Sequence, residues 1–444
     1  MIELLDRMMA DSAERPLPAL TPRGARLPWL RGKIDTVTGM RRSGKTYFLY
    51  QRIAELLRGG APRESVLYLS FEDERLLPLA ARDLHLIPDA FFRRYPAMKR
   101  RECAFFFDEI QNVEGWERFC RRLIDTERVH LCLTGSSSRL LGREIATSLR
   151  GRAIETEIFP FDFEEALAHG GVPLPTGPLP GSETVALLEN RFDAYLFEGG
   201  FPEVQGMEAD LRRRVLQEYV DVVLLRDVIE RHRLSNTTAL RQLVRHLLAS
   251  PGAAFSVHKF YNDLRSRGVA VAKDTLHAAL DHLVDAFLLF TVPIRSRSER
   301  ARMVNPRKVY PIDTGLARAL SREPGRDESR LLETLVFLDL RRRGYAVEYL
   351  VTDQGREVDF AATSSDGTLS LVQVCVSLRD PETRARELGA LSEAMAQLSV
   401  PEGTVVTRHE AETIEIDHGR IRVVPAWRFM LRQLYPLEPA QPGR

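Results

Sequence analysis

The chain has 444 residues, 44% of them hydrophobic, and a formal net charge of +1. This length exceeds one ordinary core and predicts roughly two to four domains. No run of about 18 apolar residues occurs, and the first residues lack the basic start and apolar block of a signal peptide, so we expect a cytoplasmic protein without a membrane partner. The near-zero charge gives no argument for a nucleic-acid partner, which must come from local patches.

Residues 1–33 are predicted to be a helical lead-in, and residues 34–165 alternate between strands and helices. Helical stretches such as Lys45–Leu57 separate short apolar runs that lack period-2 alternation. Such runs are typical of parallel strands buried on both faces, so this region is predicted to be a doubly wound α/β domain. The expected strands are Ile34–Val37, Val66–Phe71, Ala104–Asp108, Val129–Leu133 and Ile154–Phe159.

Three further regions are expected after this domain. Residues 166–250 hold a Pro/Gly-rich loop and then an amphipathic helical pattern. Residues 251–327 have the pattern of a winged helix, in which two helices precede two strands that flank a basic loop. Residues 328–444 return to an α/β pattern, with a helix and then strands near 346–349, 357–362 and 369–376.

The segment GMRRSGKT at residues 39–46 fits G-x-x-x-x-G-K-[ST] and lies between a buried strand and a helix. Its glycines let the backbone N–H groups point at phosphate oxygens, and the helix N-terminus adds partial positive charge. We expect Lys45 to reach the β- and γ-phosphates of ATP and Thr46 to bind Mg²⁺. The alternative is a chance match in a glycine turn. The predicted nucleotide-binding residues are Gly39, Arg42, Ser43, Gly44, Lys45, Thr46 and Tyr47.

A second motif, FFFDE at residues 105–109, is an aromatic strand with two carboxylates at its carboxyl end, where open α/β sheets bind ligands. We expect Asp108 to hold Mg²⁺ through water and Glu109 to act as general base on the attacking water. An apolar run that ends in two acids is weak evidence by itself, because solvated acids often end strands. Its position downstream of the glycine-rich loop gives it weight.

Two later segments carry further catalytic candidates. Ser136 follows the strand at 129–133 and is expected to touch the γ-phosphate or its water, the alternative being a helix N-cap. Arg152, preferred to Arg150, precedes the last strand and is a candidate arginine finger for a neighbouring subunit. The alternative is an intradomain salt bridge. A finger acts on a neighbour, so it implies a homo-oligomer.

These motifs resemble the AAA-type ATPases of bacteria and archaea that carry a family-specific C-terminal region of unknown function. The N-terminal resemblance rests on GMRRSGKT, FFFDEIQNVEGWERF, LTGSSSRLL and LRGRAIETEIFPFDFEEAL, and the C-terminal one on EGGFPEV, RDVIERH, KVYPIDTGL and REVDF. The resemblance implies an AAA-type core with a helical lid, in which the strand that ends at Asp108 lies between the sensor and P-loop strands. It also places Asp108 and Glu109 in the Walker B motif and Arg152 in the arginine-finger region.

The predicted winged helix raises the question of DNA. Its second helix carries as many acids as bases and is a poor phosphate binder, whereas the following loop is strongly basic. Such a loop is suited to phosphates or a minor groove. The alternative is that the module docks a protein. The DNA-contact candidates are Arg295, Arg297, Arg300, Arg302 and Lys308.

The last region resembles a restriction-endonuclease-like fold, in which carboxylates hold a metal and a lysine helps to activate water. Glu333, Asp359 and Gln373 stand at the acidic positions, and Cys375 stands at the lysine position. A thiol does not supply a fixed positive charge, so we expect a degenerate domain without nuclease activity. Alternatively, Asp359 is a solvated acid or a partner of Arg356.

Together these features predict a Mg²⁺-dependent ATPase that binds and remodels DNA, including branched or partly opened structures, as an oligomer. A second hypothesis is a nucleotide-gated signalling or defence switch whose C-terminal domains bind protein. A third is a toxin-linked regulator that binds DNA with little motor action.

Overall fold

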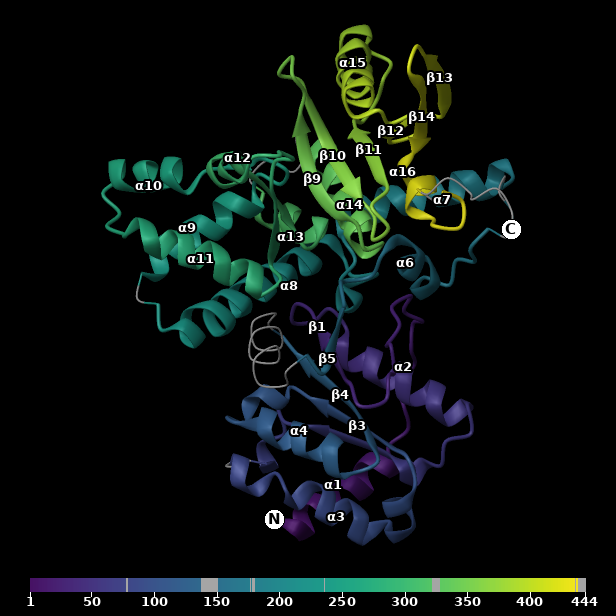
Figure 1. Ribbon diagram of the computed structural model, residues 1–444, viewed down its shortest axis with the longest axis vertical. Coiled ribbons are helices and arrows are strands. Elements are labelled where there is room, and N and C mark those ends of the chain that lie inside the picture. Colours follow the sequence, from purple (N-terminus) through teal and green to yellow (C-terminus); the bar gives the residue numbers. More distant parts are fainter. Residues whose placement is uncertain are drawn as a thin grey trace. The chain divides into compact units, whose positions relative to one another are not determined.

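The computed structural model describes residues 1–76, 79–136, 151–175, 177, 180–234, 236–321, 328–435 and 437. The chain forms two compact units (Figure 1). The first comprises Met1–Phe159 with Asp285–Phe287, and the second comprises Pro160–Val284 with Leu288–Arg444. Among the described residues, no helix combines the length and apolar character needed to cross a bilayer.

The first unit is built on a sheet of five strands, all parallel to their neighbours, in the order β2-β3-β4-β1-β5. This confirms the predicted parallel core of the AAA type. The predicted neighbours of β3, the strand that ends at Asp108, are wrong. It was expected between the sensor strand β4 and the P-loop strand β1, but it lies between β2 and β4. Strand order depends on crossover connections that local sequence does not specify. The strands are β1 (Ile34–Thr38), β2 (Val66–Ser70), β3 (Cys103–Asp108), β4 (Val129–Gly135) and β5 (Ala153–Glu157).

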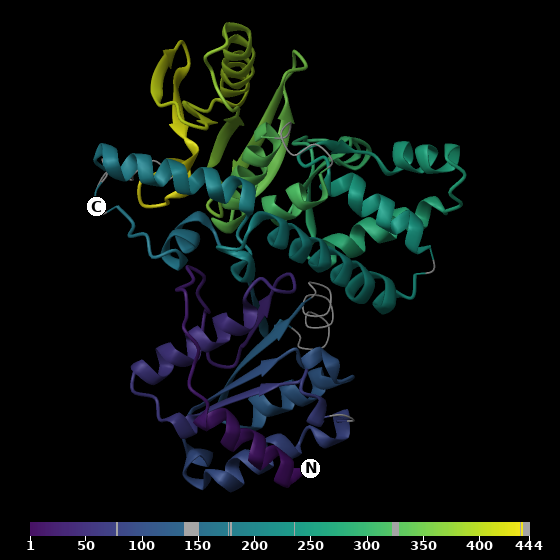
Figure 2. The same ribbon diagram turned by 180° about the vertical axis from the view of Figure 1, so that it is seen from behind.

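Helices cover both faces of this sheet, which explains why its strands are apolar without alternation (Figure 2). On one face, α1 (Ile2–Glu14), α3 (Leu86–Arg94) and α4 (Trp116–Thr126) share a core with Phe105 and Phe107. On the other face, α2 (Lys45–Arg58) packs with Phe106. Consecutive phenylalanines of β3 therefore serve opposite cores, and the strand ends with its carboxylates at the sheet's carboxyl edge.

The second unit begins with helices, of which the sequence predicts those after the Pro/Gly-rich loop but not the first, α6. A reciprocal capping box between Asp162 and Glu165 starts the first of them. The chain then runs through α6 (Phe163–His169), α7 (Ser182–Glu198), α8 (Ala209–Val222), a π-helical stretch (Val223–Glu230) and α9 (Thr237–Leu248). The buried face of α8 carries Leu216, Tyr219 and Val220, which matches the amphipathic pattern in its sequence.

Residues 251–321 combine helices with a small antiparallel sheet in the order β6-β8-β7. The elements are β6 (Ala254–Phe255), α10 (Val257–Ser266), α11 (Lys273–Asp285), β7 (Leu289–Val292), α12 (Glu299–Val304), β8 (Arg307–Pro311) and α13 (Thr314–Leu320). The sequence predicts β7, β8 and the two helices. It does not predict β6, which has two residues, or the short helix α12 inside the basic loop.

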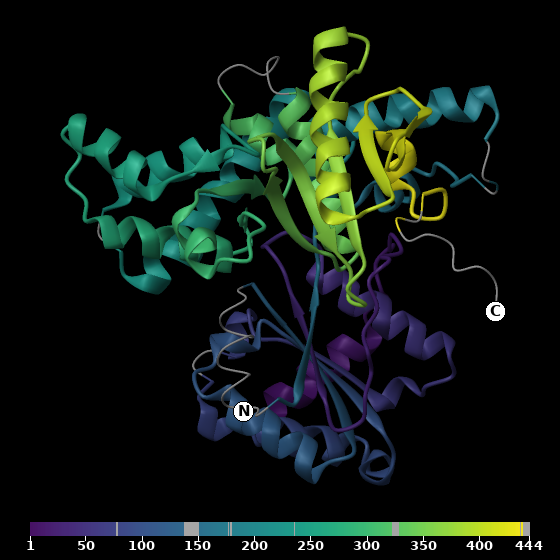
Figure 3. The ribbon, with the colours of Figure 1, turned by 45° about the horizontal axis from the view of Figure 1, so that its top comes forward.

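A mixed sheet of six strands, in the order β13-β14-β12-β11-β10-β9, forms the C-terminal α/β part (Figure 3). Its strands are β9 (Ala346–Val351), β10 (Glu357–Thr363), β11 (Leu369–Val374), β12 (Glu402–Thr407), β13 (Glu412–Ile416) and β14 (Gly419–Pro425), and its helices are α14 (Glu328–Arg342), α15 (Pro381–Leu398) and α16 (Ala426–Met430). Apolar residues of α15, such as Leu391 and Met395, pack on β10, β11 and β12.

Two of the family-like motifs meet within the second unit. Asp313 caps α13 by accepting the Leu316 N–H (3.0 Å), and its other oxygen accepts the Gly200 N–H (2.6 Å). Gly199 has a φ of +78°, and a Cβ on it would lie 2.2 Å from Asp313 Oδ1. The glycines of EGGFPEV and the aspartate of KVYPIDTGL are therefore needed together to join α7 to α13.

Candidate functional site

The glycine-rich loop connects β1 to α2 at the carboxyl edge of the first unit's sheet. Gly39 has a φ of +145°, and a Cβ there would lie 2.2 Å from the Ile158 carbonyl oxygen. Gly44 caps α2 in the left-handed region, and Arg42 also has a positive φ of 68°. Only glycine fits the first position, so the loop's curled backbone follows directly from its sequence.

Lys45 opens α2 and lies almost completely buried inside this loop. Its Nζ donates to the Gly39 and Met40 carbonyl oxygens (3.1 and 3.2 Å) and lies 3.7 Å from Glu109 Oε1. The Oγ atoms of Ser43 and Ser136 are buried and find no hydrogen-bond partner within the described chain. An ammonium bonded only to neutral carbonyls and two unsatisfied hydroxyls fit a phosphate group in this loop.

Asp108 is the hub of the acidic side of the site. Its Oδ2 accepts hydrogen bonds from Thr46 Oγ1 and Tyr68 OH, both 2.8 Å away, and its Oδ1 accepts one from Thr134 Oγ1. The structure therefore brings together Thr46 and Asp108, the two predicted Mg²⁺ ligands. Burial raises the pKa of Tyr68, and the Asp108 charge raises it further, so the phenol stays a hydrogen-bond donor.

Glu109 follows Asp108 with a left-handed backbone (φ 55°), which is uncommon for a residue with a side chain. Its N–H donates to Thr134 Oγ1 (2.8 Å), and its carboxylate accepts from the Gln111 amide. Thr134 thus bridges both carboxylate residues. The sequence indicates a group of hydroxyls at this strand end, among them Thr134, and Ser136 is the site residue chosen from it, with Ser137 as the alternative for the sensor position. Ser137 lies outside the described residues, and the contact of Thr134 with both carboxylate residues was not predicted.

The remaining candidates for the nucleotide site are exposed beside the loop, lie at the opposite edge of the sheet or fall outside the described residues. Tyr47 is exposed on α2, with its ring 6.0 Å from that of Tyr50. Arg152 forms an ion pair with Asp125 of α4, which is the intradomain alternative considered for it. Arg150 lies outside the described residues. The Arg152 carbonyl accepts the Ile34 N–H, which places Arg152 at the amino edge of the sheet.

In the second unit, Glu333 on α14 and Asp359 on β10 converge as the nuclease resemblance implies, but the lysine beside them is Lys308 of β8. Lys308 Nζ lies 2.9 Å from Glu333, 2.8 Å from Glu357 and 3.1 Å from Asp359. Lys308 is buried, so its prediction as a DNA contact is wrong: its ammonium faces carboxylates inside the unit, away from any phosphate.

The electrostatics of this cluster follow from burial and charge. Burial lowers the pKa of Lys308, but the attraction of Asp359, Glu333 and Glu357 outweighs it and raises the pKa above its usual value. Burial and the neighbouring Glu333 raise the pKa of Asp359 to about 7. Arg356 is not the partner of Asp359, because it pairs with Glu393.

The other two nuclease-position residues are fully engaged inside the sheet. Gln373 accepts the Asp359 N–H and donates to Glu387. Cys375 is buried, and burial raises the pKa of its thiol to about 12. In the described part of the chain, with Lys308 in its place between the carboxylates, no three Asp, Glu, His or Cys side chains are arranged to hold a metal ion.

The basic loop between β7 and β8 divides into paired and exposed arginines. Arg295 and Arg302 both pair with Glu348 of β9 (2.8 and 3.2 Å). Arg297 and Arg300 are exposed, and neither side chain forms a hydrogen bond or ion pair with another described residue. Backbone bonds from Arg295 to Tyr349 and from Tyr349 to Pro293 fix the loop's base to β9. The exposed arginines are thus carried on an anchored element.

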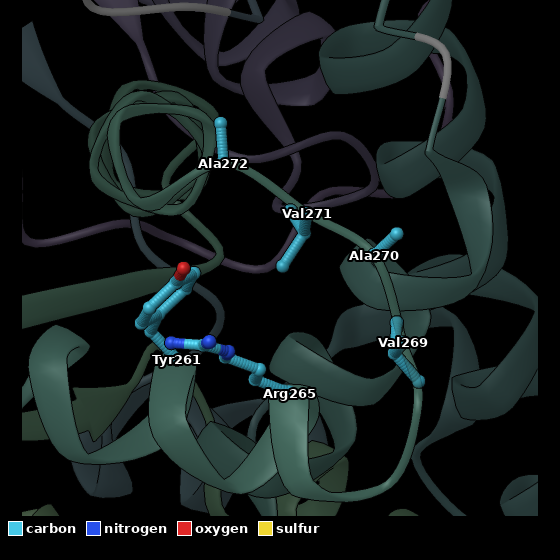
Figure 4. A pocket seen from close by; sticks show the side chains of 6 residues that line it. All are labelled: Tyr261, Arg265, Val269, Ala270, Val271 and Ala272. Atoms are coloured by element: carbon cyan, nitrogen blue, oxygen red, sulfur yellow. The ribbon is translucent and has the colours of Figure 1, made fainter.

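A hollow of about 550 Å³ lies between α10 and the turn that leads to α11 (Figure 4). Tyr261 and Arg265 reach it from α10, and residues 269–272 of the turn line its other side. Its lining combines one guanidinium and one phenol with small apolar side chains. None of the site residues predicted from the sequence lines it.

Two family models match the chain. One is described as an AAA domain and matches residues 31–167, and the other is a domain of unknown function (DUF8612) that matches residues 189–327. An uncharacterized protein of Methanocaldococcus jannaschii is 31% identical over 96% of this chain and 95% of its own length. An uncharacterized protein of Haemophilus influenzae is 30% identical over 79% of this chain and 83% of its own length. The chain belongs to the AAA-type P-loop ATPase family.

Among solved structures, the Walker-type ATPase PABY2304 of Pyrococcus abyssi is similar with a TM-score of 0.40 and 14% identity. That match covers 72% of this chain and 95% of the other. Cdc6p from Pyrobaculum aerophilum gives a TM-score of 0.25 at 14% identity, over 74% of this chain and 98% of its own.

Proposed function

We propose that the chain hydrolyses ATP with Mg²⁺ and uses the turnover to bind and remodel DNA as a homo-oligomer. The observation that carries the ATPase part is the 2.8 Å hydrogen bond between Thr46 Oγ1 and Asp108 Oδ2. It joins the glycine-rich segment at residues 39–46 to the carboxylates at the end of β3. Thr46 and Asp108 would hold Mg²⁺, which would supply neutralisation of phosphate charge. Their hydrogen bond supports this assignment.

The protein's own groups divide the remaining work. Lys45 exchanges its two carbonyl acceptors for phosphate oxygens, which carry more negative charge. Glu109 accepts a proton from the attacking water, and its position is held by Thr134 and Gln111. Ser43 and Ser136 offer buried hydroxyls to the phosphate and the water.

Substitutions at Glu109 and Lys45 test this assignment. Glu109→Gln should retain ATP binding and slow hydrolysis at least ~100-fold, since general-base catalysis contributes about that much. Lys45→Ala should weaken nucleotide binding itself. The measurements are steady-state phosphate release and binding of a fluorescent ATP analogue. Wild-type hydrolysis by Glu109→Gln would remove Glu109 as the base.

The DNA part rests on Arg297 and Arg300, which are exposed cations on a loop anchored to β9. We place them on phosphates of a duplex, with residues 251–327 acting as a winged helix. The Arg297→Gln/Arg300→Gln variant should weaken DNA binding and lower its salt slope by roughly 2. Arg295→Gln/Arg302→Gln removes equal charge from side chains that pair with Glu348, so it should change both less. Equal effects of the two variants would contradict the assignment.

The oligomer part rests on Arg152, proposed to leave Asp125 and stabilise charge on a neighbour's nucleotide. Arg152→Ala should slow hydrolysis only at concentrations where the chain assembles. Asp125→Ala, which frees the arginine, should keep the rate or raise it. If Arg152→Ala lowers a rate that is independent of protein concentration, the arginine acts within its own subunit.

A second candidate is a nucleotide-gated switch whose C-terminal part binds a protein. It is favoured by Met303 and Val304 of α12, which are 79% and 76% exposed beside the arginines. The discriminating measurement is ATP turnover with and without duplex, single-stranded and forked DNA. Stimulation by a forked substrate supports remodelling, and an unchanged rate with retained ADP supports the switch.

For residues 328–444, we propose a restriction-endonuclease-like domain that does not cut DNA. Gln373 and Cys375 are engaged inside the sheet and supply neither an acid nor a fixed positive charge. DNA cleavage with Mg²⁺ or Mn²⁺ that Asp359→Ala abolishes would overturn this proposal.

A further inference from the structure

The ammonium of Lys308 lies where three carboxylates from two different elements converge. Glu333 comes from α14, and Glu357 and Asp359 come from β10, while Lys308 itself comes from β8. The three Nζ–oxygen distances are 2.9, 2.8 and 3.1 Å, respectively. The ammonium donates hydrogen bonds to Glu333 Oε1 and Asp359 Oδ1 and forms an ion pair with Glu357. All three groups that face its charge are therefore carboxylates.

The carboxylates are also held by groups other than the lysine. Tyr310 OH donates to Glu333 Oε1 (2.6 Å), and the Val374 N–H donates to Asp359 Oδ2 (3.0 Å). The side chain of Gln373 accepts the Asp359 N–H. Glu333 and Asp359 thus keep their positions through the sheet and its neighbours, and their orientation does not depend on Lys308 alone.

The carboxylates of the cluster outnumber its ammonium by three to one. The side chains of Lys308, Glu333 and Asp359 are 5%, 14% and 12% exposed, whereas Glu357 is 49% exposed at the edge of the cluster. Converging carboxylate oxygens are the ligands that Mg²⁺, Mn²⁺ and Ca²⁺ prefer. Buried negative charge of this kind needs a cation, and here the chain supplies its own.

We propose that Lys308 is a built-in counter-ion that fills a divalent-cation site formed by Glu333, Glu357 and Asp359 and excludes metal ions from it. Carboxylate centres that cleave phosphodiesters need the metal to polarise phosphate and activate water. With the ammonium in this position, the C-terminal part keeps the carboxylates but does not bind the metal ion that phosphodiester cleavage needs. Replacing the lysine by a neutral side chain of similar length should open the site to a metal.

The test compares Mn²⁺ binding by the full chain without nucleotide, followed by electron paramagnetic resonance and thermal melting. Lys308→Met should gain one Mn²⁺ site that raises the melting temperature of the second unit. The wild type and Lys308→Met/Asp359→Asn should lack this site, which separates it from any ion held near Thr46 and Asp108. If Lys308→Met does not fold without metal, Lys308→Met/Glu357→Gln carries one charge fewer and is titrated in its place.

Two results would overturn the proposal. One is Mn²⁺ binding by the wild type that Asp359→Asn removes, because the lysine then does not exclude the ion. The other is a folded Lys308→Met or Lys308→Met/Glu357→Gln chain that binds no additional Mn²⁺, because the carboxylates then do not form a cation site.

Discussion

Each of the two units buries a lysine, and the two lysines are held in different ways. Lys45 donates to two neutral backbone carbonyls and lies 3.7 Å from Glu109. Lys308 donates to Glu333 and Asp359 (2.9 and 3.1 Å) and forms an ion pair with Glu357 (2.8 Å). A phosphate can replace neutral carbonyls with a gain in attraction, whereas no ligand offers Lys308 more than it already has. We therefore assign Lys45, which has neutral partners, to ligand binding and Lys308, which has charged partners, to the structure of its unit.

The largest effect that separates the two lysines is on stability. Lys308→Met leaves three carboxylates without a cation, so the free energy of unfolding of the second unit should fall by about 3–5 kcal/mol. Urea unfolding followed by ¹⁹F NMR of fluorotryptophan resolves Trp427 in the second unit from Trp29 and Trp116 in the first. Arg297→Met, an exposed cation of the same unit, is the control and should change stability by less than about 0.5 kcal/mol. An equal, small loss in both variants would contradict the comparison.

The next effect is a pH dependence of the stability of the second unit, which arises from its buried Asp313. Burial raises the pKa of Asp313 to about 6, although the Gly200 and Leu316 N–H groups lower it. The folded state therefore binds a proton more tightly than the unfolded state, and stability falls as pH rises from about 4 to about 6. The loss is at most about 3 kcal/mol, from ~1.4 kcal/mol per pKa unit.

Urea unfolding of the Trp427 region at several pH values measures this dependence. Asp313→Asn keeps an N-cap oxygen but does not titrate, so its stability should depend less on pH in this window. A slope that is the same in wild type and variant would assign the pH dependence to other groups.

A smaller effect is expected at the carboxylates of the first unit. Thr134→Val removes the hydroxyl that joins Asp108 to the Glu109 N–H. One hydrogen bond of about 1–1.5 kcal/mol predicts a fall in kcat of roughly 10-fold with nucleotide affinity retained. Thr126→Val, which loses a bond to the Arg122 carbonyl on the surface of α4, is the matched control. A loss of affinity with unchanged kcat would show that Thr134 serves binding instead.

The nucleotide site was predictable from sequence because its determinants are local. Gly39, Lys45 and Thr46 lie in one continuous segment, residues 39–46, and Asp108 and Glu109 stand together at the end of β3. Contacts between strands were harder to predict, because Thr134 and Tyr68 reach Asp108 only through the pairing of β4 and β2 with β3. That order is set by crossovers and not by any of the strands themselves.

The misassignment of Lys308 has an equally physical cause. Its neighbour Arg307 is exposed, and the basic loop before it made both residues look like parts of one surface. Successive residues of a strand point to opposite faces, so Arg307 and Lys308 on β8 are directed apart. Glu333 and Asp359, which accept its hydrogen bonds, are 25 and 51 positions away in sequence, and only the folded sheet brings them to it.

The most direct test of the account is ATP binding by Lys45→Met and Lys308→Met, measured with a fluorescent analogue and Mg²⁺ under conditions where ¹⁹F NMR shows the first unit folded. We predict that Lys45→Met weakens ATP binding at least roughly 10-fold, since it removes a charged phosphate contact. Lys308→Met should bind ATP as the wild type does. Wild-type affinity in Lys45→Met would contradict the central claim that the loop at residues 39–46 holds the phosphates.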